Sequence, residues 1–191
     1  MTTKLAVFAS GSGSNFQALQ EAIERGELHA TIELVITDKP GAFVVTRANN
    51  FGIPVVELAP KAFENKVAYE QKVIELLEAH DVDWVILAGY MRLVGETLLT
   101  AYENRIINIH PSLLPSFPGK DAIGQAMDHG VKVTGVTVHY VDAGMDTGKI
   151  IAQGAVDVVP GDREQTEARV HKLEHALYTN TLQQLFKQTF A

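Results

Sequence analysis

Cysteine is absent from the 191 residues of the chain, and long apolar runs are absent as well. Without cysteine, disulfides, thiolate metal ligands and cysteine nucleophiles are excluded. The longest apolar runs, such as residues 84–88, are far shorter than the roughly 18 residues of a membrane-spanning helix. Residues 5–9 are also shorter than the apolar core of about 7–15 residues in a signal peptide. These absences predict a soluble, cytoplasmic protein.

An excess of positive charge is also missing. Sixteen Lys and Arg stand against 23 Asp and Glu, which leaves a net charge of −7. This balance argues against binding to nucleic acid or to an anionic membrane, since both require a basic surface. At about 150 residues per domain, the length predicts one globular domain over residues 1–191.

Apolar runs and helical spacing alternate through the first 110 residues. Strands are predicted at 5–9, 32–37, 53–58, 83–88 and 105–109, with helices near 16–23, 43–51, 69–80 and 95–102. The almost continuous apolar run at 83–88 is typical of a parallel strand that is covered on both faces. This order predicts a parallel sheet with right-handed crossover connections.

The pattern changes after residue 110. Residues 110–119 hold three prolines and are predicted to be irregular, and a helix follows at 122–129. Predicted strands at 133–140 and 150–156 are joined by a short loop and should pair antiparallel, before a long helix at 165–187. The predicted fold class is α/β: a single Rossmann-like domain with a mostly parallel sheet and antiparallel C-terminal strands.

A glycine-rich segment, Gly11-Ser-Gly-Ser-Asn15, lies between the first predicted strand and helix. Backbone N–H groups at the start of a helix bind anions, and the serine and asparagine side chains suit a monophosphate. Phe16 stands where a dinucleotide fingerprint has its third glycine, but Asp38 occupies the expected place of a ribose-binding acid. A nicotinamide-dependent oxidoreductase and a plain tight turn are therefore the alternatives.

Asn108 and His110 form a second polar feature near the end of the fifth predicted strand. Residues two apart on a strand face the same side, and an amide inside an apolar strand needs hydrogen-bonding partners. The loops that begin near Gly11, Gly89 and His110 all follow carboxyl ends of parallel strands, where α/β proteins form ligand sites. We expect these three loops to meet at one crevice, with a satisfied turn as the structural alternative.

Three other features have plainer interpretations. His171-Lys-Leu-Glu-His175 matches an inverted zinc-protease pattern, but no Asp or Glu follows His175 as a third ligand. An ordinary amphipathic helix is the better prediction there. His139 is predicted to be a core or edge histidine with a partner, and a solvated role is the alternative for Arg92.

The segment Asn108-Ile-His-Pro-Ser-Leu-Leu-Pro115 resembles the signature of the folate-dependent formyltransferases. The glycine-rich segment, Gly89-Tyr-Met-Arg-Leu93 and Met145-Asp-Thr-Gly148 extend the resemblance over essentially the whole chain. It implies transfer of a formyl group from 10-formyltetrahydrofolate to the amine of glycinamide ribonucleotide in purine synthesis, through a tetrahedral intermediate. It also implies small-molecule partners and no metal, while the charge balance argues for no nucleic acid and no membrane as partners. A monomer or homodimer is expected.

The same resemblance assigns the site residues. Asn108, His110 and Asp146 correspond to the catalytic set. By this resemblance, the substrate phosphate is bound by Gly13, Ser14 and Asn15. Glu174 corresponds to a carboxylate that contacts the ribonucleotide. The folate site is formed by Lys66, Met91, Arg92, Leu93, Val94 and Asn108. The sequence departs from the family at Lys66, where arginine is frequent, and at Lys149, where proline is frequent.

Two other members of the superfamily, methionyl-tRNA formyltransferase and formyltetrahydrofolate deformylase, are less similar. The first carries a C-terminal RNA-binding domain and the second an N-terminal regulatory domain, and we expect neither within 191 residues. A non-catalytic folate or phosphate binder is a third alternative. It would not require Asn108, His110 and Asp146 together.

The glycine-rich segment leads to a first prediction. If Gly13 allows the backbone to approach a phosphate, Gly13→Val should weaken binding of the ribonucleotide and leave folate binding nearly intact. Titration of the variant with each ligand measures this difference. Equal loss of both ligands would indicate a folding defect instead.

Overall fold

Strand β5 (Ile106–His110) contains the boundary between two units of the chain, which divide between Ile107 and Asn108. The computed structural model describes residues 1–189. Seven strands follow the sheet order β3-β2-β1-β4-β5-β6-β7. The predicted fold class is confirmed: the sheet is mixed, with parallel strands first and an antiparallel pair at the C-terminal end. The prediction of one domain over residues 1–191 stays a prediction.

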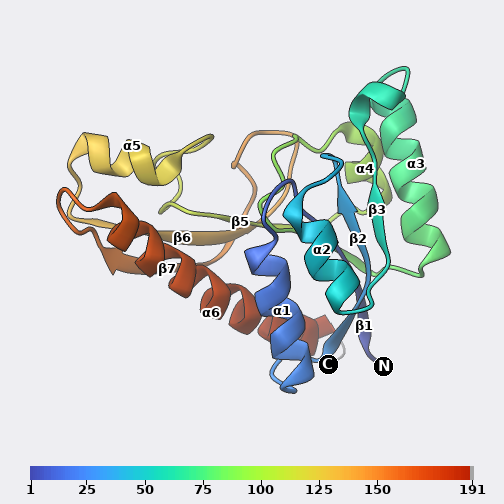
Figure 1. Ribbon diagram of the computed structural model, residues 1–191, viewed down its shortest axis with the longest axis horizontal. Coiled ribbons are helices and arrows are strands. Elements are labelled where there is room, and N and C mark those ends of the chain that lie inside the picture. Colours follow the sequence, from blue (N-terminus) through green and yellow to red (C-terminus); the bar gives the residue numbers. More distant parts are fainter. Residues whose placement is uncertain (190–191) are drawn as a thin grey trace. The chain divides into compact units, whose positions relative to one another are not determined.

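The first unit alternates strands and helices (Figure 1). Its elements before β5 are β1 (Thr3–Phe8), α1 (Ser14–Glu24), β2 (Ala30–Thr37), α2 (Phe43–Asn50), β3 (Val55–Glu57), the 3-10 turn η1 (Pro60–Ala62), α3 (Lys66–Ala79), β4 (Trp84–Leu87) and α4 (Glu96–Ala101). Every residue of β4 is buried, as its unbroken apolar sequence predicted. Only η1 has no counterpart among the predicted elements.

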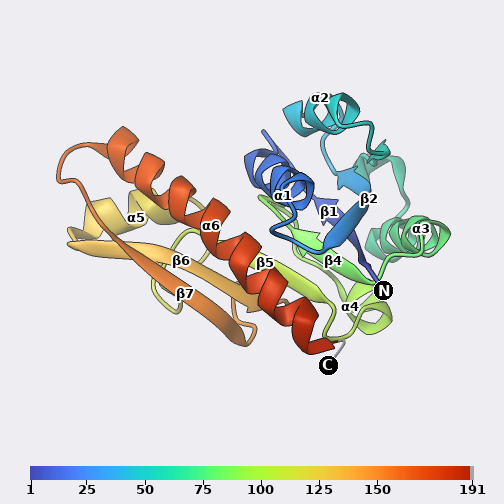
Figure 2. The same cartoon turned by 90° about the horizontal axis from the view of Figure 1, so that it is seen from below.

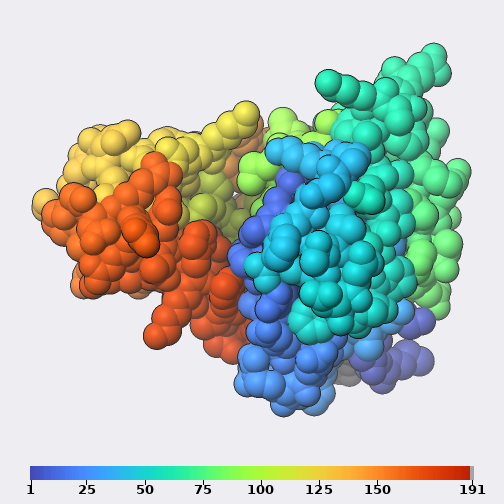
Figure 3. Space-filling model, viewed as in Figure 1, coloured from blue at the N-terminus to red at the C-terminus, as the bar shows by residue number. Residues whose placement is uncertain are grey.

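Strand β1 is the point where the order of strands reverses. It pairs in parallel with β2 on one side and with β4 on the other. Right-handed crossovers that run in opposite directions place α1 and α2 on one face and α3 and α4 on the other. The contacts agree, because α1 packs against α2 and α3 packs against α4. In the space-filling view, the side chains of α1 and α2 form one continuous surface (Figure 3).

The second unit contains the antiparallel part of the sheet. Its elements after β5 are α5 (Ala122–His129), β6 (Val133–Tyr140), β7 (Ile150–Asp157) and α6 (Arg163–Thr189). β6 and β7 pair antiparallel, as the short loop between them predicted, and α6 lies along both strands (Figure 2). α6 begins before residue 165, because the Asp162 carboxylate accepts a hydrogen bond from the Gln165 N–H at 2.9 Å and caps the helix. Within residues 1–189, no helix is long and apolar enough to cross a membrane.

Gly13 has a structural role that the sequence did not reveal. Its φ is 76°, in the left-handed region that favours glycine, where it precedes α1. A Cβ at this position would lie 2.5 Å from Val44 Cγ2 and 3.0 Å from Val44 Cα. The expectation that Gly13→Val would weaken ribonucleotide binding by a clash with the phosphate alone is therefore corrected, because the added side chain also clashes with Val44.

We now expect Gly13→Val to lower the free energy of unfolding by about 3 kcal/mol, from backbone strain and overpacking together. Gly11→Ala is the matched control, since a Cβ there meets no atom within 4 Å and the backbone is not left-handed. Urea unfolding of both variants measures the difference. Similar stabilities would contradict the packing argument.

Candidate functional site

Two loops of the first unit meet at the carboxyl ends of β1 and β4. The Ser10 N–H donates to the Gly89 carbonyl at 3.1 Å, and the Met91 N–H donates to Ser10 Oγ at 2.9 Å. Open α/β sheets bind ligands at such a switch point. Two of the three loops expected at one crevice are therefore adjacent. The part of that expectation that concerns the loop after β5 stays a prediction.

The buried carboxylate of Asp38 is used inside this junction. Ser10 Oγ donates to Asp38 Oδ1 at 2.6 Å, and Asp38 is only 7% exposed. The oxidoreductase alternative needs this acid to face the ribose of a dinucleotide. Asp38 instead fixes Ser10 and, through Ser10, the loop that contains Met91.

The glycine-rich segment is held in place by groups other than the predicted phosphate ligands. The Val44 N–H donates to the Gly11 carbonyl at 3.1 Å, and Arg47 Nε donates to the Ser12 carbonyl at 2.7 Å. Gly13, Ser14 and Asn15 then open α1, so the first N–H groups of this 11-residue helix lie at the segment predicted to bind an anion.

A hollow in the first unit brings together most of the predicted folate residues. Lys66, Arg92, Leu93 and Val94 line it, together with Tyr69 and Tyr90. Met91 does not line it and is 61% exposed. The guanidinium of Arg92 lies 5.2 Å from the centre of the Tyr69 ring, which orients this cation in the hollow.

Buried polar groups stabilise the walls of this hollow. The Glu70 carboxylate accepts hydrogen bonds from the Gly95 N–H at 2.7 Å and the Leu98 N–H at 3.4 Å, at the start of α4. The Tyr69 and Tyr90 hydroxyls lie 3.4 Å apart. Burial raises the pKa of both tyrosines, so both phenols stay neutral at physiological pH.

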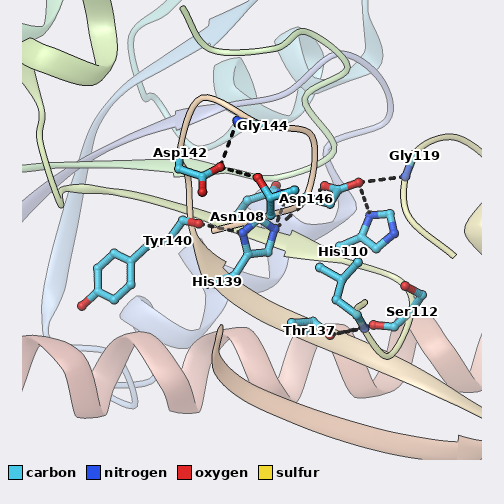
Figure 4. A network of polar contacts seen from close by, with 12 residues as sticks. Asn108, His110, Ser112, Gly119, Thr137, His139, Tyr140, Asp142, Gly144 and Asp146 are labelled. Atoms are coloured by element: carbon cyan, nitrogen blue, oxygen red, sulfur yellow. Dashed lines mark hydrogen bonds and ion pairs between the residues drawn. The ribbon is translucent and has the colours of Figure 1, made fainter. Parts of the chain in front are cut away.

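In the second unit, Asp146 lies between two histidines (Figure 4). His110 Nδ1 is 3.5 Å from Asp146 Oδ2, and His139 Nε2 is 3.9 Å from Asp146 Oδ1. The Gly119 N–H donates to Asp146 Oδ2 at 2.8 Å. All three side chains are at least 87% buried, so their interactions are only weakly screened by solvent.

The tautomer of His110 follows from its second partner. Nε2 lies 2.9 Å from the Phe117 carbonyl oxygen, and a carbonyl only accepts hydrogen bonds. Nε2 therefore carries a hydrogen, and a further proton on this ring occupies Nδ1, the nitrogen that faces Asp146. The Phe117 carbonyl and the Asp146 carboxylate thus fix the orientation of the ring and decide which nitrogen carries each proton.

His139 orients Asn108 by the same logic. Its Nδ1 lies 2.8 Å from the Tyr140 carbonyl and donates to it, which leaves Nε2 as the acceptor of the neutral ring. Burial lowers the pKa of His139, so the ring is neutral at pH 7. The Asn108 amide nitrogen, 3.2 Å from Nε2, is therefore the donor. The prediction that His139 is a buried histidine with a partner is confirmed.

The structure thus joins Asn108, His110 and Asp146 through His139, which sequence reasoning had not placed in the site. The sequence did contain a signal for this role of His139. His139 is the penultimate residue of β6, and the loop after β6 contains Asp146. The contributions of the Phe117 carbonyl and the Gly119 N–H had no signal, because backbone groups are the same at every residue.

Glu174 lies on the buried side of α6, 5% exposed, and its Oε2 is 3.4 Å from His171 Nδ1. This carboxylate raises the pKa of the His171 imidazole. Across residues 1–189, no three His, Asp or Glu side chains form a group that could hold a metal ion. The predicted contact of Glu174 with the ribonucleotide stays a prediction.

Fold and site together describe an α/β enzyme whose polar residues lie on β5, at the end of β6 and on the loops that follow β1, β4 and β6. Comparison with known proteins narrows this class. A model of the formyl transferase family matches residues 3–182. A phosphoribosylglycinamide formyltransferase of Bacillus subtilis is 55% identical over 183 residues, which are 95% of this chain and 94% of that protein.

A solved structure and a larger relative give further matches to proteins of the same kind. The crystal structure of a phosphoribosylglycinamide formyltransferase from Bacillus halodurans matches with a TM-score of 0.94 and 53% identity, and covers 98% of this chain and 97% of that one. The trifunctional purine biosynthetic protein adenosine-3 of Drosophila melanogaster is 41% identical over 97% of this chain, although only 14% of that protein is covered. The chain belongs to the formyl transferase family, as its resemblance predicted.

The buried histidine leads to a prediction about pH. In the unfolded chain the pKa of His139 returns to its ordinary value near 6.5, so acid protonates the unfolded state first. The free energy of unfolding should therefore fall as the pH drops below 6.5. His139→Gln should remove part of this fall in urea unfolding between about pH 7.5 and 5.

His171→Gln should have the opposite effect on how the free energy of unfolding changes with pH. Because the pKa of His171 is raised, its contribution is complete below pH 6.5 and is lost as the pH rises through the raised pKa. A profile for His139→Gln that is parallel to that of the original protein would contradict a buried, neutral His139.

Proposed function

We propose that this formyl transferase moves the formyl group of 10-formyltetrahydrofolate to the glycinamide amine of 5′-phosphoribosylglycinamide, in the synthesis of purines. The names of relatives that match nearly the whole chain support this substrate pair. The observation that carries the proposal is the cluster of Asn108, His110 and Asp146, which offers an amide donor, an imidazole and a carboxylate close together.

The reaction places clear demands on such a set. When the amine nitrogen attacks the formyl carbon, a C–N bond forms and negative charge develops on the formyl oxygen. Collapse of this tetrahedral intermediate breaks the bond to the folate nitrogen. The attacking amine loses a proton and the folate nitrogen gains one, so the site needs hydrogen-bond donors for the oxyanion and a group that carries protons.

Asn108 is proposed as a donor to the oxyanion. One hydrogen of its amide is used on His139 Nε2, which also fixes which end of the amide is nitrogen. The same contact fixes the direction of the second amide hydrogen, which is proposed to donate to the oxyanion. A preorganised donor of this kind is typically worth about 3–4 kcal/mol of transition-state stabilisation.

His110 and Asp146 are proposed to act as a pair. A proton on His110 Nδ1 would lie beside the Asp146 carboxylate. From there the positive ring can donate to the oxyanion and then pass this proton to the leaving folate nitrogen. The neutral Nδ1 then takes up the proton that the amine loses, which restores the charged ring. The Phe117 carbonyl keeps the other nitrogen occupied, so the exchangeable proton is confined to Nδ1. The Asp146 carboxylate stabilises the charged ring while the transfer takes place.

The first unit supplies the proposed binding groups. Lys66 and Arg92 place two cations at a hollow that also has the apolar walls of Leu93 and Val94, which suits a folate with its carboxylates. Met91 is proposed to contact the folate from the adjoining loop. Gly13, Ser14 and Asn15 are proposed to hold the phosphate of the ribonucleotide. From the second unit, Glu174 on α6 is proposed to accept hydrogen bonds from the hydroxyl groups of the ribonucleotide.

The direct test is an assay with both substrates that follows released tetrahydrofolate. We expect turnover that requires the ribonucleotide, and a loss of at least about 100-fold in kcat for His110→Ala. Turnover with water as the acceptor would instead indicate a deformylase. A well-folded protein with no turnover would overturn the proposal.

The role of the carboxylate can be tested with a matched pair of variants. Asp146→Asn keeps the size of the side chain and removes the charge beside His110, so kcat should fall about 100-fold. Asp142→Asn makes the same change on the same loop, where the carboxylate caps the Gly144 N–H and the Thr147 hydroxyl, and should leave kcat within about twofold. Equal effects of the two variants would remove Asp146 from the mechanism.

The phosphate site is better tested at Ser14 than at Gly13, since the Ser14 side chain can be shortened without strain. Ser14→Ala should raise KM for the ribonucleotide about tenfold, which is the expected loss of one hydrogen bond to a charged group. KM for the folate should stay within about twofold. A parallel rise in both values would contradict a phosphate-specific role.

A further inference from the structure

We propose that Thr137 is a positioning residue, whose buried hydroxyl holds the segment that orients His110 and Asp146. The inference rests on the proposed function for its effect on turnover. Thr137 acts on His110 and Asp146 through the backbone of residues 111–121, which connect β5 with α5.

Residues 111–121 have no regular structure, yet both members of the proposed pair depend on them. The Phe117 carbonyl accepts from His110 Nε2 at 2.9 Å, and the Gly119 N–H donates to Asp146 Oδ2 at 2.8 Å. A helix or strand would maintain these positions through its own hydrogen-bond ladder. An irregular segment needs contacts from elsewhere.

Thr137 Oγ1 supplies those contacts at the start of the segment. It donates to the Ser112 carbonyl at 2.7 Å and accepts from the Leu114 N–H at 3.1 Å. Gln153 Nε2 donates to the same oxygen at 3.0 Å and to the Leu114 carbonyl at 2.9 Å. A hydroxyl has one hydrogen and two lone pairs, so every hydrogen-bonding position of Thr137 is in use.

The arrangement of the strands explains why these two side chains act together. Thr137 on β6 and Gln153 on β7 are direct partners in the antiparallel register. Thr137 and Ser112 are fully buried, so water cannot replace a lost bond. Ser112 continues the network, because its hydroxyl donates to the Ser116 carbonyl, one residue before Phe117, at 2.5 Å.

The same strand offers a matched control. Thr134 is also on β6 and only 2% exposed, but its hydroxyl oxygen has no hydrogen-bond partner in the described part of the chain. Threonine and valine have almost the same shape. Thr137→Val and Thr134→Val therefore remove the same atom from similar surroundings, and only the first removes hydrogen bonds.

The experiment compares Thr137→Val, Thr137→Ser and Thr134→Val by kcat, by KM and by the nitrogen NMR signals of the His110 ring, which report its tautomer. We expect Thr137→Val to lower kcat about tenfold with KM within about twofold, and to shift the His110 ring signals. Thr137→Ser keeps the hydroxyl and should restore kcat. Thr134→Val should match the original protein in every measurement.

A second variant covers the case in which Thr137→Val does not fold. Gln153 is exposed, and Gln153→Met removes its two bonds to the network without opening the core. It should lower kcat and shift the His110 signals in the same direction, by less. An unchanged His110 spectrum in the folded variants, or a kcat of Thr137→Val equal to that of Thr134→Val, would overturn the inference.

The NMR measurement separates this inference from the proposed function. If the original protein fails to turn over the two substrates, the proposed function is lost. The His110 spectra of the Thr137 and Gln153 variants still decide whether the network positions the ring.

Discussion

Much of the second unit depends on how one buried carboxylate is satisfied. Asp146 is 13% exposed, and an ionised carboxylate at that depth is strongly destabilising unless hydrogen bonds and positive charge surround it. Here the Gly119 N–H donates to it, and His110 presents Nδ1, the nitrogen that takes up a further proton. Asp146 also has a φ of 56°, a left-handed conformation that costs a residue with a Cβ about 1–2 kcal/mol. The contacts of its side chain offset that strain.

The backbone contributes as much to the site as the side chains do. Carbonyls at Phe117 and Tyr140 assign one tautomer to His110 and the other to His139. The two rings therefore differ although they lie near the same carboxylate: His110 presents Nδ1 to Asp146, while His139 presents an acceptor to Asn108. Loops that a rigid sheet positions often contain the chemistry of an α/β protein. Here one carbonyl on a loop and one at the end of β6 select the protonation pattern of the two rings.

In the first unit, some of the residues proposed to bind ligands also stabilise the fold. Gly13 allows Val44 to pack closely and also places the start of α1. At Lys66 the chain has an ammonium where the family often has a guanidinium. This side chain lines the hollow beside Arg92. Lysine supplies a point charge without the planar fork that binds a carboxylate through two bonds, so Arg92 remains the group suited to bidentate recognition.

Much could be predicted from the sequence alone. The alternation of apolar runs predicted nearly every strand and helix, and the bounds of α5 and β6 were correct to the residue, because periodicity is a local property. The spacing of Asn108 and His110 on β5 predicted a shared face, and the resemblance of four short motifs predicted the family.

Tertiary structure alone decided the remaining features. Gly13 packs against Val44, and His139 contacts Asn108. Thr137 binds the backbone of Ser112 and Leu114, and Gln153 binds the Leu114 carbonyl. These contacts join residues 23 to 39 positions apart. No local pattern reveals such contacts, because the identity of a threonine or a histidine does not show which distant residue will contact it in the folded chain. Their chemistry is set by burial and geometry, which exist only after the chain has folded.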